Sequence, residues 1–516
     1  MANKTLFASA GGQRAAVTRN HAGGAAYQLS ARQTLAQLAI TGCLNQTHYM
    51  SATLQLDELI AAAHQVEPEF LAKTAIYCRK HGYMKDTPAL LTALLATISP
   101  DHLGRAFAGT IDNGKMLRNF VQIMRSGVAG RRSLGTRPKR LVQDWLNDAS
   151  DMHLLRACIG QDPSLADVIK MVHPRPASKQ REAFYAWLIG KPCDVDLLPD
   201  MVRAFIAFKQ GTKGRPIPDV PFQMLTSAKL TRKHWAKIAE NGGWHMLRMN
   251  LNTFQRHGVF EISACTKRLA KRLSDRGKIA RARVFPYQLM AAWKHADPKL
   301  PLVIREALQD AMELAIENVS AVKGRVVVCP DVSGSMSSPV TGHRHGSSSV
   351  IRCVDVAALF AAAILRKNPD ARIMPFDFVV HDIQPNPRDT VLTNAQLLAA
   401  IGGGGTACSA PIARLNAEQA AADLVILVSD NESWADRSHG RGTPFMAEWQ
   451  DLKRRCPDAR LVCLDITPNA TTPAYERNDV LNIGGFSDQV FELIAAFTED
   501  RLGPDHWVGE IERIEL

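Results

Sequence analysis

A short polar loop, Asp331-Val-Ser-Gly-Ser335, follows directly after the apolar run of residues 326–330. Asp331, Ser333 and Ser335 stand at alternate positions, so their side-chain oxygens can turn toward one point. If the apolar run is a strand, the loop lies at the carboxyl edge of a sheet, where open α/β sheets bind ligands. One carboxylate and two hydroxyls suit a hard, partly hydrated cation, with Mg²⁺ first and Mn²⁺ or Ca²⁺ next. For this loop alone, a solvated turn is the alternative, because Ser, Gly and Asp also form ordinary turns.

Two later segments offer further oxygen ligands. Thr406 follows a run of four glycines, and Asp430 comes soon after the apolar run 424–428. This order of Asp, Ser, Ser, Thr and Asp at strand ends or loops resembles the metal-ion-dependent adhesion site of von Willebrand factor A domains. The resemblance implies that a divalent cation is held, in part through water, by Asp331, Ser333, Ser335, Thr406 and Asp430.

After residue 323, the predicted strands alternate with predicted helices, and these elements must position the ligands. We expect strands at 325–329, 371–380, 424–428 and 461–466, and helices at 351–367, 410–421, 445–455 and 487–497. Continuous apolar strands that alternate with helices predict a doubly wound α/β domain, with a parallel sheet covered on both faces. Residues 342–349 are polar and glycine-rich, which predicts a loop beside the cation site.

The preceding residues have a different pattern. From about residue 30 to 322, apolar residues recur at spacings of three and four, the mark of amphipathic helices. Gly and Pro interrupt the pattern about every 12 to 20 residues, and 211–220 is expected to be an exposed loop. This pattern predicts a degenerate α-solenoid. The predicted organisation is a flexible segment at 1–24, a helical domain at 25–322 and an α/β domain at 323–516.

Composition limits the classes of protein to consider. The 516 residues are 46% hydrophobic, enough for more than one buried core. No apolar stretch approaches the roughly 18 residues of a membrane-spanning helix, and the N-terminus lacks the apolar core of a secretory signal. The ten cysteines form no C-x-x-C pair. We therefore expect a cytoplasmic protein with reduced thiols and no membrane partner.

Charge separates the two parts of the chain. Residues 1–320 contain 44 Lys and Arg against 25 Asp and Glu, a net charge of +19, whereas residues 321–516 have a net charge of −7. The positive part favours a polyanionic partner, and nucleic-acid phosphate is the natural one.

Three basic clusters contribute most to this charge. In the first, Pro138 suits the first turn of a helix, whose N-terminus and surrounding cations would form a phosphate cradle. The second is 229–237, followed by Arg248, and the third is 267–283. A solvated helix face remains the alternative for the third cluster alone. The candidate RNA-binding cations of the three clusters are Arg131, Arg132, Arg137, Lys139, Arg140, Arg248, Lys271, Arg272, Arg281 and Arg283.

A basic helical module followed by an adhesion-type domain resembles the Ro autoantigen family, whose N-terminal part is the TROVE module. The matching segments are 130–145, 164–174, 245–252, 280–287 and 429–432. The resemblance implies an all-α ring of HEAT-like helical repeats, closed by the von Willebrand factor A-like domain. It also implies binding of small structured Y RNAs, and of single-stranded 3′ ends of misfolded noncoding RNA, in a ribonucleoprotein scaffold for RNA quality control or processing.

Other implications of the resemblance concern single residues and partners. His173 matches an RNA-facing segment, and the alternative is that it caps or packs its helix. Residues 163–165 lack a histidine that some relatives carry. The chain is most similar to a bacterial Ro protein, and we expect a monomer. In such relatives a 3′→5′ exoribonuclease is a partner.

Catalytic motifs are missing from the sequence. It contains no Walker A lysine, no G-x-S-x-G elbow and no H-E-x-x-H helix. We therefore expect a protein that is not an enzyme, with the open position of the cation filled by the carboxylate of a partner protein. The alternative function is an adhesion-type, protein-binding scaffold on a helical solenoid, without a specific RNA role.

Overall fold

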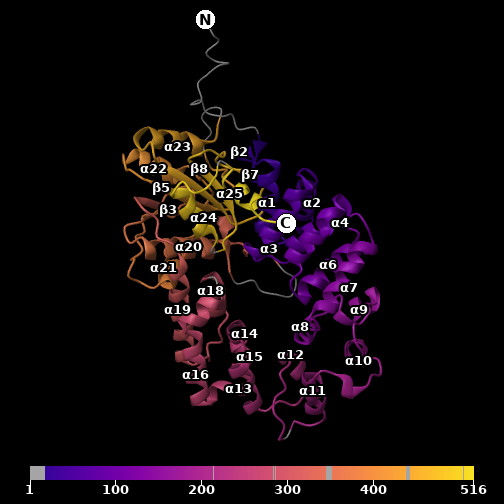
Figure 1. Ribbon diagram of the computed structural model, residues 1–516. Helices are drawn as coiled ribbons and strands as arrows, with labels where there is room; N and C mark the ends of the chain where they lie inside the picture. Colours follow the sequence, from indigo (N-terminus) through magenta and orange to yellow (C-terminus); the bar gives the residue numbers. More distant parts are fainter. Residues whose placement is uncertain are drawn as a thin grey trace. The chain divides into compact units, whose positions relative to one another are not determined.

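The computed structural model describes residues 18–212, 214–282, 284, 286–343, 351–436, 442–487, 489–503 and 505–516 (Figure 1). The first 17 residues of the predicted N-terminal segment, residues 344–349 of the predicted loop and Arg283 lie outside this range. The described chain forms two compact units. The first, here called the α/β unit, comprises residues up to 66, 284–294 and 312–514. The second, here called the helical unit, comprises residues 67–283 and 295–311.

A five-stranded parallel sheet forms the centre of the α/β unit, with the strand order β4-β3-β5-β6-β8. The three middle strands are buried almost throughout, which explains why they read as continuous runs of Val, Ile and Leu. Their bounds, with those of the two edge strands, are β3 Val326–Pro330, β4 Arg372–Ile373, β5 Leu424–Ser429, β6 Arg460–Asp465 and β8 Val480–Gly484.

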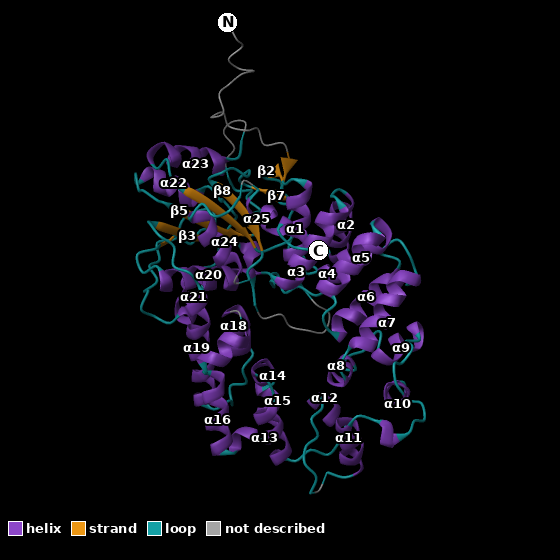
Figure 2. Cartoon of the chain, viewed as in Figure 1, coloured by secondary structure: helices purple, strands orange, loops and turns teal. Residues whose placement is uncertain are grey.

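Helices cover both faces of this sheet (Figure 2). On one face, Trp449 of α23 and Ile412 of α22 pack in a buried cluster with Val327 and Val425 of the strands. On the other face, α20 packs on β3, and Phe360 of α20 stacks on Phe491 of α24. The helix bounds are α20 Cys353–Lys367, α21 Val391–Ala399, α22 Ala410–Ala417, α23 Pro444–Arg455, α24 Gln489–Thr498 and α25 His506–Glu512. The predicted doubly wound α/β architecture is confirmed.

Residues before 67 belong to the α/β unit, which differs from their predicted place in the helical domain. A three-stranded antiparallel sheet joins β1 (Thr18–Arg19), β2 (Ala25–Gln28) and β7 (Thr471–Thr472). Helix α1 (Ala31–Thr41) packs against β8, and α2 (Ala52–His64) packs on α1. Strand β1 lies within the segment predicted as flexible. These residues are placed in the α/β unit by pairing between β2 and β7, which lie more than 400 residues apart in sequence. No local sequence pattern encodes such a pairing.

The helical unit is built from amphipathic helices, as predicted, and residues 30–322 contain no β-strand within the described part of the chain. The loop 211–220 joins α11 to α12, also as predicted. The bounds are α3 Pro68–Lys80, α4 Asp86–Ile98, α5 Pro100–Thr110, α6 Gly114–Ser126, α7 Thr136–Asp148, α8 Asp151–Ala157, α9 Leu165–Val172, α10 Lys179–Leu188, α11 Asp200–Gln210, α12 Phe222–Leu225, α13 Arg232–Asn241, α14 Trp244–Met249, α15 Leu251–Arg256, α16 Ser263–Leu273 and α17 Arg276–Ala282. Next come α18 Pro286–Lys294, in the α/β unit, and α19 Leu302–Ala315, whose last residues belong to that unit.

The predicted strand at 371–380 is shorter in the structure: β4 ends at Ile373, and the pairing of the following residues with β3 and the loop after it stops at Phe376. The chain turns at Asp377, whose N–H donates to the carbonyl of Val379 and whose side chain accepts from the Val379 N–H. Strand β8 and helix α21 were not predicted. All ten cysteines are free thiols, as predicted. Among the described residues, no helix has both the length and the apolar character needed to cross a membrane.

Candidate cation site and basic surface

The Asp331–Ser335 loop lies at the carboxyl end of β3, and its three oxygen-bearing side chains are buried. The Ser333 N–H donates to Asp331 Oδ1 at 2.8 Å, and the Ser333 and Ser335 hydroxyls lie 3.2 Å apart. Ser429, the last residue of β5, donates its hydroxyl to Asp331 Oδ2 at 2.6 Å. These contacts bring the predicted ligands of the loop together.

The glycine run places Thr406 beside this loop. The Gly334 N–H donates to the Gly404 carbonyl at 3.0 Å, and the Gly404 N–H donates to Asp377 at 3.0 Å. A Cβ atom on Gly403 would lie 2.5 Å from the Gly334 nitrogen, so only glycine permits this approach. Thr406 itself is buried, as predicted for a ligand.

Asp430 completes the predicted set at the end of β5. Its side chain is buried and hydrogen-bonded to Ser335. Burial, followed by the charge of Asp430, raises the pKa of Asp331 to about 7. Burial also raises the pKa of Asp430, and it raises the pKa of both Glu432 and Asp465 to about 8. Burial therefore shifts all four carboxyl groups toward the neutral form, and a positive charge among them would oppose this shift.

The donor set fits a divalent cation. None of the largest influences on these four pKa values is a Lys or Arg of the described residues. The charge of His48 lowers the pKa of Asp430, and a divalent cation among these carboxylates would favour their charged forms further. The described chain brings no three His, Cys, Asp or Glu side chains together at a metal-binding distance. A cation held by Asp331 and Asp430 would consequently depend on the hydroxyls, as in the predicted set.

Sequence reasoning missed the residues that cover this site. A small cavity beside Ser335 and Asp430 is also lined by Thr47, His48 and Tyr49, from the segment between α1 and α2. These residues precede the loop by nearly 300 positions. No motif or spacing in the sequence marks them.

A basic cavity of about 600 Å³ lies at the start of α7 in the helical unit. Arg132, Lys139 and Arg140 of the predicted cluster line it, and Arg125 of α6 is a lining cation that the sequence reasoning missed. Pro138 lies in the first turn of α7, as predicted. The position of the cavity at a helix N-terminus, with four cations around it, suits a phosphate group.

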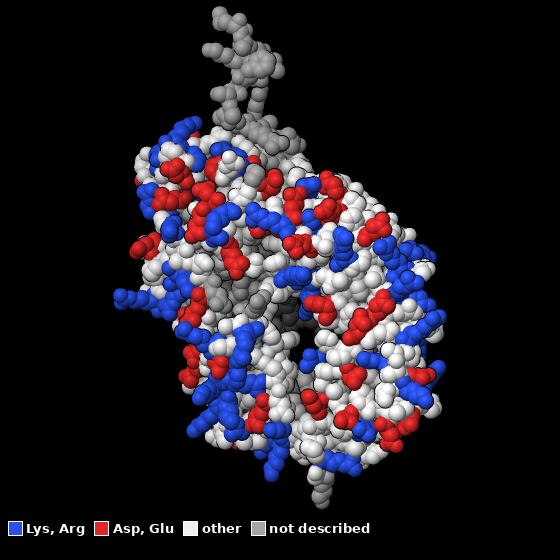
Figure 3. All heavy atoms as spheres, viewed as in Figure 1, with Lys and Arg blue, Asp and Glu red and all other residues white. Residues whose placement is uncertain are grey.

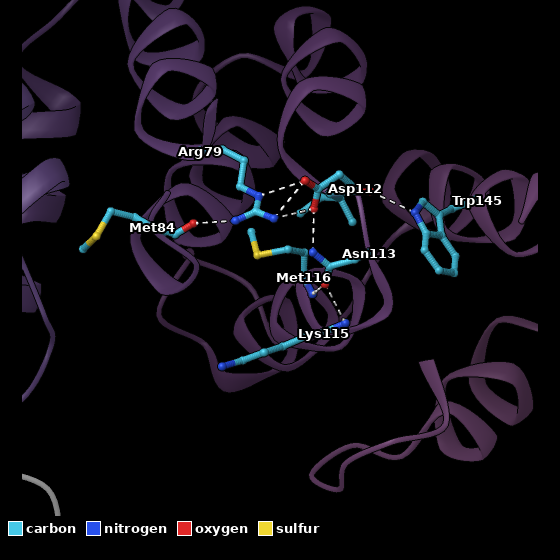
Figure 4. Close-up of polar contacts among 8 residues, drawn as sticks. Arg79, Met84, Asp112, Asn113, Lys115, Met116 and Trp145 are labelled. Atoms are coloured by element: carbon cyan, nitrogen blue, oxygen red, sulfur yellow. Dashed lines mark hydrogen bonds and ion pairs between the residues drawn. The ribbon is translucent and has the colours of Figure 1, made fainter. Parts of the chain in front are cut away.

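Helix α7 is anchored from its opposite end (Figure 4). Trp145 donates its indole N–H to the carbonyl of Ile111 at 2.9 Å. The next residue, Asp112, accepts three hydrogen bonds from Arg79, at 3.1, 2.9 and 2.8 Å, and Asn113 caps the first turn of α6. Because α6 also carries Arg125, this turn ties together both helices that line the cavity.

The other candidates of the first cluster lie around the cavity rather than on its wall. Arg137 forms an ion pair with Asp101 at 3.1 Å, with half of its side chain exposed. Arg131 packs against Gly135. His173 ends α9 with a left-handed backbone (φ +50°), and its carbonyl accepts from Gln143, a residue of the cavity wall. The histidine therefore caps its helix.

The third cluster forms a second basic surface over α16 and α17, where Lys and Arg side chains gather in Figure 3. Lys271 is exposed. Arg281 lines a cavity of about 490 Å³, although its Nε donates to the carbonyl of Gly277. Arg272 lines the same cavity but caps α13 by donating to the carbonyls of Ala239 and Glu240.

Arg248, on α14, is half-buried. Its Nε is buried, so this part of the side chain faces the interior. Of the predicted RNA-binding cations in the described range, Arg248 and Arg272 are therefore the ones most engaged in the fold.

Three similarities to known proteins agree with this architecture. Residues 325–498 match the family model of the Ro60 vWA domain. The chain is 25% identical to the RNA-binding protein RO60 of Deinococcus radiodurans, over 93% of this chain and 94% of that protein. The crystal structure of the Deinococcus radiodurans RO (RSR) protein superposes with a TM-score of 0.63 at 21% identity, covering 92% of this chain and 100% of that one.

The structural match confirms the predicted fold, a helical region followed by a von Willebrand factor A-like domain. The Deinococcus relative is described as an RNA-binding protein. Residues 325–498 thus match a Ro60-type von Willebrand factor A domain, and over most of its length the chain is similar to Ro proteins.

Proposed function

We propose that the protein binds noncoding RNA through the basic surfaces of the helical unit. The observation that carries this proposal is the cavity at the N-terminus of α7, lined by Arg125, Arg132, Lys139 and Arg140. Its volume of about 600 Å³ is within the range of about 300–1,000 Å³ typical of ligand pockets. The net charge of +19 over residues 1–320 supports a polyanionic ligand.

The RNA ligands proposed are small structured Y-type RNAs and the single-stranded 3′ ends of misfolded noncoding RNA. The protein would act as a cytoplasmic, monomeric ribonucleoprotein scaffold, without a membrane partner, to which a 3′→5′ exoribonuclease is recruited. The Ro-type motifs support this proposal, as does the description of the Deinococcus relative as an RNA-binding protein.

We also propose that Mg²⁺, or Mn²⁺ or Ca²⁺ in its place, binds at Asp331, Ser333, Ser335, Thr406 and Asp430. The support is the cluster of buried carboxylates, whose pKa values are raised by burial and by each other. The cation would supply the compensating charge and fix the loops at the carboxyl edge of the sheet. The RNA-binding residues are on separate elements, so we expect RNA affinity to depend little on the cation.

The function is tested by offering the purified protein a structured RNA with a free single-stranded 3′ tail, and a blunt duplex of equal length. The tailed RNA should bind more tightly and stay intact in gel analysis. Failure to bind either RNA would overturn the proposal and favour the protein-binding scaffold. Metal-dependent cleavage that disappears in Asp331→Ala would contradict the non-catalytic role.

A further inference from the structure

The segment between α1 and α2, residues 43–50, is fastened to the α/β unit beside the cation site. We call it the strap. The Asn45 side chain donates to the carbonyl of Thr341 at 3.0 Å, and the His343 N–H donates to the carbonyl of Gln46 at 2.7 Å in an isolated antiparallel bridge. All of these residues lie in the same compact unit. The strap thus has a defined course along the loop that follows Ser335.

Local hydrogen bonds hold the tip of the strap in a tight turn. Thr47 donates its N–H to the Met50 carbonyl at 2.9 Å, and the Met50 N–H returns a bond to the Thr47 hydroxyl at 3.1 Å. The two residues inside this turn are His48 and Tyr49, whose rings meet edge to face with centroids 4.6 Å apart. The turn therefore places the His48 and Tyr49 side chains next to each other.

Both side chains line the small cavity beside Ser335 and Asp430, two of the predicted ligands. The His48 Nδ1 lies 3.4 Å from the Ser338 hydroxyl, and Tyr49 shares a hydrogen bond with Ser335. Burial raises the pKa of Tyr49, and the charges of Asp430, Glu432 and Asp331 add to this effect, which places the phenol among these carboxylates. Tyr49 therefore lies beside Ser335 and Asp430 and is influenced by the charge of Asp331, a third proposed ligand.

The space left under the strap is small. The cavity lined by Tyr49, Ser335 and Asp430 has a volume of about 10 Å³ for water-sized spheres, which is room for about one water molecule. The carboxylate of a partner protein, with the side chain that carries it, is far larger. It cannot enter beside Tyr49 unless the strap moves.

We propose that Tyr49 closes the cation site. A bound cation then holds the strap against the rest of the α/β unit, and no external carboxylate reaches the ion while the strap is in place. This inference rests on the proposed cation site. It replaces the expected open position, filled by a partner protein, with an internal closure.

Mn²⁺ can test the closure because bound Mn²⁺ speeds the relaxation of any water protons that exchange on and off it. The wild type and Tyr49→Ala should both bind Mn²⁺, measured from the loss of the free-ion electron-spin signal. The water relaxivity of bound Mn²⁺ should be low in the wild type and at least twofold higher in Tyr49→Ala. Tyr83→Ala, in the helical unit, is the matched control and should behave as the wild type does.

The outcomes separate the inference from the cation site on which it rests. If Mn²⁺ binds to the wild type but not to Asp331→Ala, and its relaxivity is equally high in the wild type and in Tyr49→Ala, the site is open and the closure is refuted. If no saturable Mn²⁺ binding depends on Asp331, the cation site itself is refuted. If relaxivity is low in the wild type and rises only in Tyr49→Ala, the result supports both the cation site and its closure by Tyr49.

Hydrogen exchange gives a test that does not depend on the folding of the Tyr49 variant. If the strap opens only after the cation leaves, Mg²⁺ at a hundred times its Kd should slow exchange of the strap amides by about 100-fold. This slowing should be absent in Asp331→Ala. Strap amides that exchange at the same rate with and without saturating Mg²⁺, in a wild type shown by calorimetry to bind it, would refute the closure.

Discussion

Neutralising the cavity at the start of α7 tests the RNA interface most directly. The variant replaces Arg132, Lys139 and Arg140 with glutamine, which removes three cations of the cavity wall and keeps most of their length. The matched control is Arg137→Gln, because Arg137 is on the same helix but pairs with Asp101 and does not line the cavity.

The expected magnitude follows from counterion release. Each phosphate contact on single-stranded RNA contributes about 0.7 to the slope of log K against log salt, so the loss of three contacts should reduce the slope by about 2. Between 50 and 200 mM salt the concentration rises fourfold, and a slope of 2.1 then corresponds to roughly 20-fold in affinity. Over this interval, the wild type should lose about 20-fold more affinity than the variant does.

The assay is fluorescence anisotropy with a labelled, 3′-tailed RNA at several salt concentrations, repeated with unrelated sequences. The three changes should weaken all sequences by similar factors, because phosphate contacts position a strand without reading its bases. Circular dichroism should show that the variant is folded. A folded variant with the slope of the wild type would show that the cavity is not a phosphate site, and would move the interface to the surface over α16 and α17. If Arg137→Gln reduced the salt slope as much as the triple change does, lining the cavity would not distinguish the cations that bind RNA.

Three further predictions concern the α/β unit. Mg²⁺ at a hundred times its Kd should stabilise the wild type by about 2.7 kcal/mol, and Asp331→Ala not at all, in thermal scans with and without the ion. Burial raises the pKa of Glu476 from its ordinary 4.5 to about 7. The folded state therefore becomes less stable as pH rises from 4.5 to 7, because the buried carboxyl must ionise. In urea titrations between pH 5 and 8, the free energy of unfolding should fall less in Glu476→Gln than in the wild type. Gly403→Ala should weaken Mg²⁺ binding in calorimetry, because its Cβ would lie 2.5 Å from the Gly334 nitrogen, whereas Gly402→Ala has nothing within 4 Å and should bind as the wild type does.

The five proposed ligands could be predicted because each belongs to a local pattern. Asp331 and Asp430 follow buried apolar runs, and parallel strands bring their carboxyl ends to one edge of a sheet. The register pairs Pro330 with Val428, so the two loops begin side by side. Thr406 follows a glycine run that can approach another backbone closely. Strand periodicity and sheet topology therefore bring these loops to one edge, and the resemblance to the adhesion site selects the five ligands among their residues.

The elements around the set could not be predicted in the same way. The run 371–380 is apolar enough for a strand, and Met374 and Phe376 still donate to carbonyls of β3, but the Asp377 side chain bonds to its own turn and the pairing stops there. Strand β8 contains Asn482, whose polar side chain weakens the apolar pattern. In the structure this amide is satisfied by Ala474 and Glu476.

The N-terminal residues differ most from their predicted place, because their contacts are the most distant in sequence. Gln28 donates to the carbonyl of Ala470, and Gln37 to that of Thr467. A helical period in α1 and α2 predicts helices correctly but does not reveal which core buries them. For the same reason, the strap between them could not be recognised as part of the cation site.

The strap gives the cation a role that the ligand motif alone does not imply. In the chain, the strap leads through α2 directly to residue 67, where the helical unit begins. A cation closed in by Tyr49 would hold this connection at its start, because the strap could leave the α/β unit only after the ion is released. Loss of the ion would then free the path of the chain into the RNA-binding unit without changing a single RNA-binding residue. In this view the cation stabilises contacts within the α/β unit. Its binding should therefore be detectable as reduced mobility of residues 43–50, without any protein partner.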